Sequence, residues 1–341
     1  MIRRPTINDV ARAAGVSKRT VSRVINGSDK VNVQTRDRIE TLIREMGFRP
    51  NRQARGLAMR RSYLLGLVYD VPTHFIADMQ GGVLGVCRDS GFELLVHACE
   101  AHGPQGVDEI LQFVERVHLD GLVVLPPFSQ LSRLIDGLER TGDAGFELTS
   151  EVSKQPWRQI VTDYAPAISA MTGHLFDLGH RRFGFVSGPE DNLSSRKRGE
   201  TFAQALAGYG LTLRPEWITE GAFTFESGAA AARTMLGGTD RPTAIFAAND
   251  EMALAVIRVA NDMGLAVPGD LSVVGFDGTP FSAFVTPALT TIARNTQEMA
   301  ELAAHKLIDL IEQGEDAARR HATRVTPTFI ARESTGPAPA P

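Results

Sequence analysis

The sequence contains only two cysteines, Cys87 and Cys99, and their spacing matches neither a metal knuckle nor a Cys-x-x-Cys redox pair. We therefore expect two reduced, structural thiols and no metal site. No run approaches the ~18 apolar residues that a membrane span requires. The basic N-terminal segment MIRRPTINDV is followed by no apolar export signal. These absences predict a cytoplasmic protein with no membrane contact.

Motifs for catalysis are missing too. The sequence shows no Gly-x-Gly-x-x-Gly, phosphate-binding loop, nucleophile elbow or paired metal histidines in the right context. We therefore expect no catalytic residue, no cofactor and no enzyme activity.

The composition and charge indicate a globular chain with two unlike parts. Hydrophobic residues make up 43% and charged residues 22% of 341 residues, a length that favours two or three domains. Residues 1–61 hold 15 Lys and Arg against 5 Asp and Glu, whereas the remainder holds 21 against 35. A head of charge +10 and a body of charge -14 suit a head that neutralises DNA phosphates and a body that stays off the DNA.

The head has the pattern of a helix-turn-helix. Thr6 precedes apolar residues at helical spacing up to Ala14, Gly15 permits a sharp turn, and Ser17 caps a second helix to about Ile25. On this second helix Val21 and Val24 are expected to face inward. That leaves four residues exposed to read base edges: Lys18, Arg19, Ser22 and Arg23.

A third helix is expected from Val33 to Met46, capped by Asn32, and it closes the core of the head. The basic segment Asn51 to Arg61 follows, with Leu57 as its main large apolar residue. This leucine either wedges into a minor groove or packs onto the body.

From Ser62 onward, short apolar runs alternate with helix-length stretches, which predicts parallel βαβ units and two sheets. Ligands bind at the carboxyl ends of such strands. The side chains just after the runs are therefore candidates: Asp70, Pro126, Asp163, Ser187, Asn249 and Asp277.

The segments Thr6–Gly27 (TINDVARAAGVSKRTVSRVING) and Phe48–Ala58 (FRPNRQARGLA) resemble the lactose-repressor (LacI/GalR) family of bacterial transcriptional regulators. So do DLGHRRFGFVSGP (Asp177–Pro189), RPTAIFAANDEMALA (Arg241–Ala255), LSVVGFD (Leu271–Asp277) and the terminal ARES. The resemblance implies a small all-α helix-turn-helix head and an α/β two-lobed periplasmic-binding-protein-like core with parallel sheets and three crossovers.

The expected domains are a head (1–50), a hinge helix (51–61), a core (62–335) and a disordered tail (336–341). Lobe one takes about 62–161 and 292–322, and lobe two about 162–291 and 323–335. The tail carries no apolar heptads, which favours a dimer over a tetramer.

The resemblance places base reading on Lys18, Arg19 and Arg23, phosphate contacts on Ser17 and Asn26, and the inserted leucine at Leu57. The full expected DNA-binding set is Thr6, Ser17, Lys18, Arg19, Thr20, Ser22, Arg23, Asn26, Asn51, Arg52, Ala54 and Leu57. The expected effector-binding set is Asp70, His74, Phe75, Ser194, Arg198, Phe223, Asn249 and Asp277.

Several of these residues have a structural alternative. Arg198 is alternatively a helix-surface ion pair, Asn249 a helix cap, and His180 is expected to be structural. The atypical stretch Thr141–Trp157 offers Glu147 or Glu151 either as a ligand carboxylate or as a solvated acid.

The resulting hypothesis is a cytoplasmic, nucleoid-associated homodimer that binds a pseudo-palindromic operator under the control of a small molecule, with a sugar expected. A purine corepressor is the alternative, and an exported solute-binding protein is a weaker one.

Overall fold

The computed structural model describes residues 5–25, 28–48, 61–70, 72–99, 106–141, 144–149 and 156–340. The chain divides into two compact units, residues 1–63 and residues 64–341.

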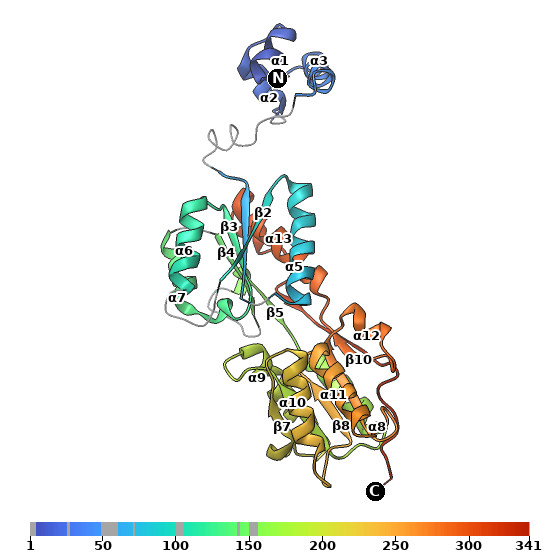
Figure 1. The fold of residues 1–341 in the computed structure, drawn as a ribbon. Coiled ribbons are helices and arrows are strands. Elements are labelled where there is room, and N and C mark those ends of the chain that lie inside the picture. Colours follow the sequence, from blue (N-terminus) through green and yellow to red (C-terminus); the bar gives the residue numbers. More distant parts are fainter. Residues whose placement is uncertain are drawn as a thin grey trace. The chain divides into compact units, whose positions relative to one another are not determined.

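The first unit is a three-helix head (Figure 1). Its helices are α1 (Ile7–Ala13), α2 (Lys18–Ile25) and α3 (Val33–Glu45). Gly15 turns the chain between α1 and α2 with φ +63°, the left-handed conformation that glycine adopts without strain. Val10, Val21 and Ile39, one from each helix, are fully buried in a common core. The head therefore has a hydrophobic core of its own.

The second unit contains two parallel-stranded sheets, each forming one lobe. The sheet of lobe one has the order β11-β5-β4-β3-β1-β2. Its strands are β1 (Leu64–Tyr69), β2 (Glu93–Ala98), β3 (Gly121–Val124), β4 (Ala144–Thr149), β5 (Gln159–Thr162) and β11 (Arg324–Val325). Figure 1 shows α5 (His74–Ser90) and α13 (Thr296–Gln313) on one face, and α6 (Gly106–Val117) and α7 (Ser132–Thr141) on the other. The short helices η1 (Phe128–Gln130), η2 (Pro156–Arg158) and α14 (Glu315–Ala318) complete this lobe.

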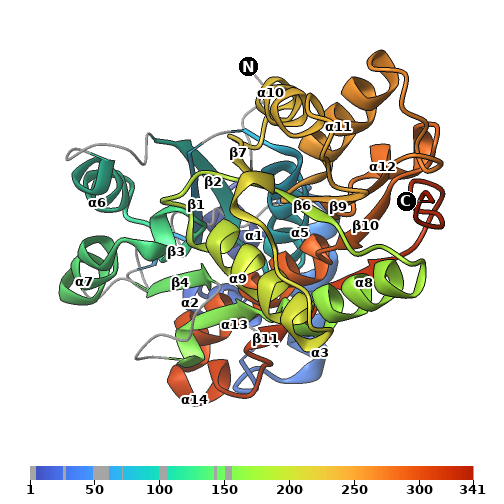
Figure 2. The ribbon, with the colours of Figure 1, turned by 90° about the horizontal axis from the view of Figure 1, so that it is seen from below.

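The sheet of lobe two has the order β12-β10-β9-β8-β6-β7, in which only β12 pairs antiparallel. Its strands are β6 (Phe183–Ser187), β7 (Ile218–Glu220), β8 (Ala244–Ala247), β9 (Ser272–Asp277), β10 (Thr290–Ala293) and β12 (Thr328–Ile330). Figure 2 shows α8 (Ala165–Asp177) and α9 (Leu193–Gly208) on one side of this sheet. The helices α10 (Phe225–Leu236) and α11 (Asp250–Asp262) lie on the other side. The short helices are η3 (Pro215–Trp217) and α12 (Pro280–Phe284).

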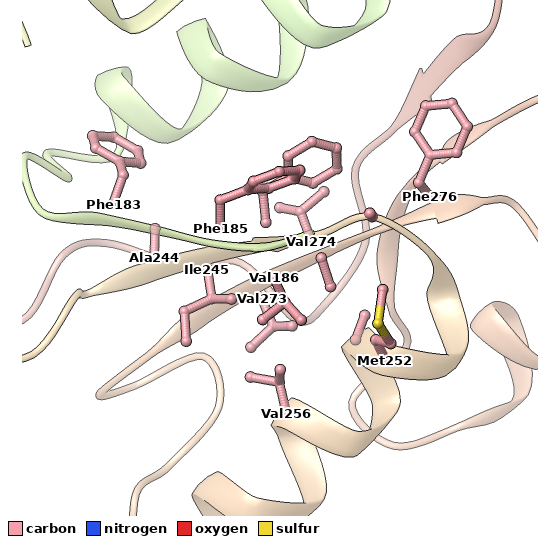
Figure 3. Packing of buried hydrophobic residues seen from close by; sticks show 14 of the residues in the cluster. Phe183, Phe185, Val186, Ala244, Ile245, Met252, Val256, Val273, Val274 and Phe276 are labelled. Atoms are coloured by element: carbon pink, nitrogen blue, oxygen red, sulfur yellow. The ribbon is translucent and has the colours of Figure 1, made fainter. Parts of the chain in front are cut away.

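The core of lobe two is packed on both faces of its sheet. Figure 3 shows Phe183 and Phe185 on one side of the strands, with Met252 and Val256 of α11 on the other. All four side chains are at most 3% exposed. Strands buried on both faces explain why the sequence shows continuous apolar runs there rather than an alternating pattern.

The atypical stretch between Thr141 and Trp157 contains a strand that the sequence pattern did not indicate. Strand β4 lies between β3 and β5 in the middle of the first sheet, and its central residues are buried. Glu147 interrupts the apolar pattern and is only 7% exposed, so the expectation of a solvated acid is wrong for it. Burial raises the pKa of its carboxyl to about 7, reinforced by Glu139 and opposed by Arg158. Glu151 lies outside the described residues.

The chain crosses between the lobes three times: after β5, between β10 and α13, and between β11 and β12. The expected lobe boundaries need two corrections. Strand β10 pairs with β9 up to Ala293, so lobe two extends beyond residue 291. Val325 was expected in lobe two, but it pairs with Thr162 of β5. Pro327, which has no N–H to donate, separates β11 from β12 and lets the two strands join different sheets.

The expectation of a disordered tail is also wrong, because residues after Ser334 pack onto lobe two. The backbone carbonyl of Gly336 lies 3.0 Å from Nε2 of His180, and the Ala338 N–H donates to the Leu178 carbonyl at 2.8 Å. His180 is fully buried and also contacts Thr243 and Ser272 at 3.0 and 2.9 Å, which confirms its structural role. The tail therefore supplies a hydrogen-bond acceptor that a buried imidazole needs.

Both cysteines are free and buried, as expected, and burial raises the pKa of the Cys87 thiol to about 11. Within the described ranges, no helix has the length and apolar character for crossing a membrane. The same residues contain no group of three His, Cys, Asp or Glu side chains arranged to hold a metal ion.

Candidate DNA-binding helix and effector site

The second helix of the head presents basic side chains that have no other role in the described structure. Val21 and Val24 are buried, as the pattern predicted, and Lys18 and Arg19 are exposed. Among the described residues, neither of these two side chains forms a hydrogen bond or an ion pair. Arg23 is half-buried at the last turn of α2. The positive charge at the start of α2 is therefore available to an external anion.

Hydroxyl side chains at the helix starts already have partners within the head. The Ser17 hydroxyl accepts from the Thr20 N–H at 3.1 Å and lies 2.9 Å from the Thr20 hydroxyl. Thr6 and Asp9 cap α1 reciprocally. Ser22 is half-buried. Asn26, Asn51, Arg52, Ala54 and Leu57 lie outside the described residues.

In lobe two, Arg198 of α9 projects toward the carboxyl ends of the strands. It is 2% exposed, donates to the Ala248 carbonyl, and its guanidinium carbon lies 3.9 Å from the Phe276 ring centroid. It is not an ion pair on the helix surface. Burial lowers the pKa of Arg198, and the positive charge of Arg294 lowers it further.

Asp277 ends strand β9 in an uncommon backbone conformation, with φ +113°. Its Oδ1 lies 3.4 Å from Nε of Arg294, within ion-pair range, but the geometry of a hydrogen bond is not met and both atoms are without a hydrogen-bond partner. The Arg294 guanidinium also lies 4.3 Å from the Phe75 ring centroid. Strain of this kind is held by the surrounding structure and is concentrated at functional sites.

Both the oxygen and the nitrogen of the Asn249 side-chain amide form hydrogen bonds. Its oxygen accepts from the Met252 N–H at 2.9 Å and so caps α11, while its nitrogen donates to the Phe223 carbonyl at 2.9 Å. Phe223 has φ +62°, and its ring fills the space where a Cβ on Gly188 would stand, 2.2 Å from the nearest ring atom. Asn249 thus positions Phe223 as well as capping the helix.

Asp250, the next residue, is 1% exposed and lies close to Asp277. One carboxylate oxygen accepts from the Thr279 N–H and hydroxyl at 2.7 and 2.9 Å, and Thr291 donates to the other. Burial, followed by the charge of Asp277, raises the pKa of Asp250 to about 7. This carboxyl therefore links α11 to the start of α12 and to β10.

The remaining candidate residues have fewer contacts with Arg198, Asp277 and Arg294. Phe75 and His74 begin α5 of lobe one and reach lobe two: Phe75 contacts Arg294, and the His74 ring lies 4.9 Å from that of Phe281. Ser194 is buried near the start of α9, and Asp70 is half-buried at the end of β1. Asp163 pairs with Arg324 at 3.6 Å and accepts from the Ala165 N–H, which is a structural role.

Comparison with known proteins identifies both parts of the chain. Residues 6–51 match the model of the lacI family of bacterial regulatory proteins, and residues 172–335 match that of the periplasmic binding protein-like domain. Catabolite control protein A of Priestia megaterium is 32% identical, over 89% of this chain and 91% of that protein. The chain belongs to the LacI family.

Other members of the LacI family agree with this assignment. The transcriptional repressor CytR of Escherichia coli is 32% identical over 90% of each chain. The Lac repressor dimer, solved bound to operator and the anti-inducer ONPF, has a TM-score of 0.82 at 27% identity and covers 98% of this chain and 100% of that chain. The regulator CelR, solved with cellobiose, has a TM-score of 0.70 at 28% identity, over 97% and 100%. This protein is therefore a DNA-binding transcriptional regulator with an effector-binding domain.

One residue of this cluster was not predicted from the sequence. Arg294 directly follows β10, and the rule that selected Asp277 at the end of β9 selects Arg294 at the end of β10. The run LTTIA was not recognised as a strand because it is short and shows little alternation of apolar and polar residues. The structure places the guanidinium groups of Arg198 and Arg294 against the Phe276 ring, and Arg294 also contacts Asp277 and Phe75.

Proposed function

We propose that this regulator is a homodimeric repressor whose affinity for a pseudo-palindromic operator is set by a small polyhydroxylated effector of the sugar class. The effector binds where the strands of the two lobes end. The observation that carries the proposal is the cluster of Arg198, Arg294 and Asp277 beside Phe75. The two guanidinium groups offer donors, the carboxylate offers an acceptor, and Phe75 offers a half-buried apolar ring. Hydroxyl groups pair with the donors and the acceptor, and the Phe75 ring packs against the apolar face of a sugar.

The DNA-binding part of the proposal rests on α2. Its exposed Lys18 and Arg19 carry unpaired positive charge at the N-terminal end of the helix that enters the major groove in helix-turn-helix proteins. The basic balance of residues 1–61 supplies the electrostatic attraction to phosphates.

The dimer is proposed from lobe one and from the Lac repressor. Strand β2 is one of the two edge strands of its sheet and leaves Val96 42% exposed, and Leu84 of α5 is 43% exposed. An edge strand with an exposed apolar side chain is a surface that proteins normally cover. We infer that a second copy covers it, because the Lac repressor neighbour was solved as a dimer. A nucleoid-bound cytoplasmic regulator without catalytic activity fits this organisation.

The first experiment is an affinity selection of fragmented genomic DNA on the purified protein at moderate salt, followed by sequencing. A short palindrome enriched beside sugar uptake or glycoside-cleaving genes is the expected outcome. No enrichment, with or without added sugars and purines, would contradict sequence-specific binding. Enrichment that requires an added purine would replace the sugar with a corepressor.

The second experiment tests the effector site with Asp277→Asn. The variant is expected to retain operator affinity and to lose the shift in operator affinity that the effector causes, measured by fluorescence anisotropy. An unchanged response would remove Asp277 from the site.

A further inference from the structure

The effector region contains two guanidinium groups that share one aromatic neighbour. The guanidinium carbons of Arg198 and Arg294 lie 3.9 and 5.4 Å from the Phe276 ring centroid. Arg198 is 2% exposed, and the Arg294 side chain is 11% exposed. Two positive charges are thus held close together and largely out of water.

Two nearby acids, Asp277 and Asp250, offset this charge only in part. Asp277 lies 3.4 Å from Nε of Arg294 but makes no hydrogen bond to it through Oδ1. Burial raises the pKa of Asp250 to about 7, and both of its oxygens accept from Thr279 and Thr291. Nε of Arg198 and Nε of Arg294 are both buried without a hydrogen-bond partner. A buried guanidinium group with an unsatisfied N–H is costly, so this arrangement favours an added anion.

We propose that the effector of this protein carries an acidic group, a carboxylate or a phosphate, which binds between Arg198 and Arg294. The guanidinium fork matches the two oxygens of either group, and hydrogen bonds between two charged groups are the strong ones. Asp277 then accepts from a hydroxyl of the same ligand. This inference rests on the proposed effector site and specifies the ligand class within it.

Arg294 also gives the acidic group a connection to lobe one. Its guanidinium packs on Phe75 at the start of α5, while its backbone N–H donates to the Asp277 carbonyl at 3.1 Å. An anion bound by Arg294 therefore acts on a side chain that contacts both lobes. Such a contact is a means by which ligand binding changes the relation between lobes.

The test is a titration of the full-length protein with glucose, glucuronate, glucose 6-phosphate and inorganic phosphate, each at the same ionic strength. Binding is measured by calorimetry and by the shift in thermal unfolding temperature. We expect at least one of the anions to bind and to raise the unfolding temperature, with no effect of glucose. Glucuronate and glucose 6-phosphate distinguish a carboxylate site from a phosphate site.

The decisive variant is Arg294→Gln, which keeps a polar side chain and removes the charge. It is expected to weaken binding of the anion about tenfold or more, since hydrogen bonds to charged groups are worth at least that factor. Arg324→Gln is the matched control, because Arg324 is 60% exposed and pairs with Asp163 rather than with Asp277. The control is expected to bind the anion as the unmodified protein does.

Two results would overturn the inference. One is glucose binding as tightly as its acidic counterparts, with Arg294→Gln unaffected. The other is that no anion raises the unfolding temperature of the unmodified protein by more than it raises that of the Arg294→Gln variant. Either result leaves operator binding intact, whereas failure of the proposed function is seen in the DNA selection itself.

Discussion

The arginines of the head differ in what their guanidinium groups contact. Arg38 donates to the Ala14 carbonyl at 2.6 Å and Arg36 to the Ser28 carbonyl at 2.8 Å, so both fasten α3 to the rest of the head. Arg19 on α2 has no such partner among the described residues and is exposed. Similar residues in one small domain therefore divide into those that hold the head together and those left exposed, which composition alone does not separate.

Arg19→Ala should weaken operator binding by about 1 to 3 kcal/mol while leaving the thermal stability of the head unchanged, because the side chain is exposed and forms no hydrogen bond or ion pair with the described part of the head. Arg38→Ala is the control and should lower stability by about 1 kcal/mol through loss of its bond to Ala14. Operator affinity by anisotropy and thermal unfolding measure the two effects. Equal loss of stability in both variants would contradict this division of roles.

Glu147 is a buried acid that makes stability depend on pH. Its folded pKa of about 7 lies above its ordinary value of 4.5, so the folded protein holds the proton more tightly than the unfolded chain does. The free energy of unfolding therefore falls as the pH rises from about 4.5 through about 7. Glu147→Gln should raise stability at pH 8 by ~1 to 3 kcal/mol and change it little at pH 5. Urea denaturation at both pH values measures this, and an equal effect at both would rule the ionisation out.

Residues at strand ends could be predicted from the sequence wherever the strand itself was recognisable. Asp277 and Asn249 follow continuous apolar runs and were found, and Arg198 was found by its resemblance to a family motif. Arg294 was not, because LTTIA alternates too little to mark a strand. The bonding of Asn249 to Phe223 was not predictable, since it depends on a positive φ at residue 223 that no local pattern signals.

At the scale of elements, the absence of a side chain at Gly188 lets the loop after β7 pack against the end of β6. The Phe223 ring occupies the position of a Cβ on Gly188, at the end of β6. Gly188 also donates its N–H to the Ser195 hydroxyl at 2.7 Å. Glycine at this place lets an aromatic ring approach the backbone of a strand end.

Gly188→Ala should therefore lower stability by about 1 to 3 kcal/mol by displacing the Phe223 ring. Gly208→Ala at the end of α9 is the matched control, since nothing lies within 4 Å of its added Cβ, and it should be neutral or slightly stabilising. Adding Phe223→Ala to Gly188→Ala should recover part of the lost stability. Urea denaturation of the unmodified protein, the two glycine variants, Phe223→Ala and the double variant measures these effects. A double variant whose loss of stability equals the sum of the Gly188→Ala and Phe223→Ala losses would contradict the clash.

The C-terminal segment is an element that composition described wrongly. GPAPAP reads as a flexible tail, yet Gly336 and Ala338 both bond to lobe two. The prediction was wrong because the partners of the tail lie far away in the sequence, buried His180 being 156 residues from Gly336. Strand β4 was not predicted for a related reason. Its place between β3 and β5 is set by tertiary pairing, and its sequence carries a buried acid.

Deleting residues 336–341 should lower stability by ~1 to 3 kcal/mol, because Nε2 of the buried His180 loses its carbonyl acceptor. Deleting only residues 339–341 is the control, for it leaves both Gly336 and Ala338 in place. Thermal unfolding of the two truncated proteins gives the comparison. Equal stability would show that the Gly336 carbonyl contributes nothing.

At the scale of the whole molecule, the chain joins two units that each have a hydrophobic core. The head surrounds Val10, Val21 and Ile39, and the larger unit has separate cores in its two lobes. The fold class and the two-part organisation could both be predicted from the sequence, because charge asymmetry and βαβ alternation extend over many residues. Under the proposed function, the effector is expected to reach the operator through the spacing of the two heads in a dimer.

Separating the two units should therefore preserve both folds and remove tight operator binding. A fragment of residues 1–63 is expected to unfold cooperatively by circular dichroism and to bind the operator about 10²-fold to 10⁴-fold more weakly than the full chain. The reason is that two linked heads gain effective concentration that a free head lacks. Residues 64–341 are expected to retain the dimer in sedimentation and to bind no operator. If the isolated head bound as tightly as the full chain, then pairing of heads would add nothing to affinity, and the effector would have no spacing of heads through which to act.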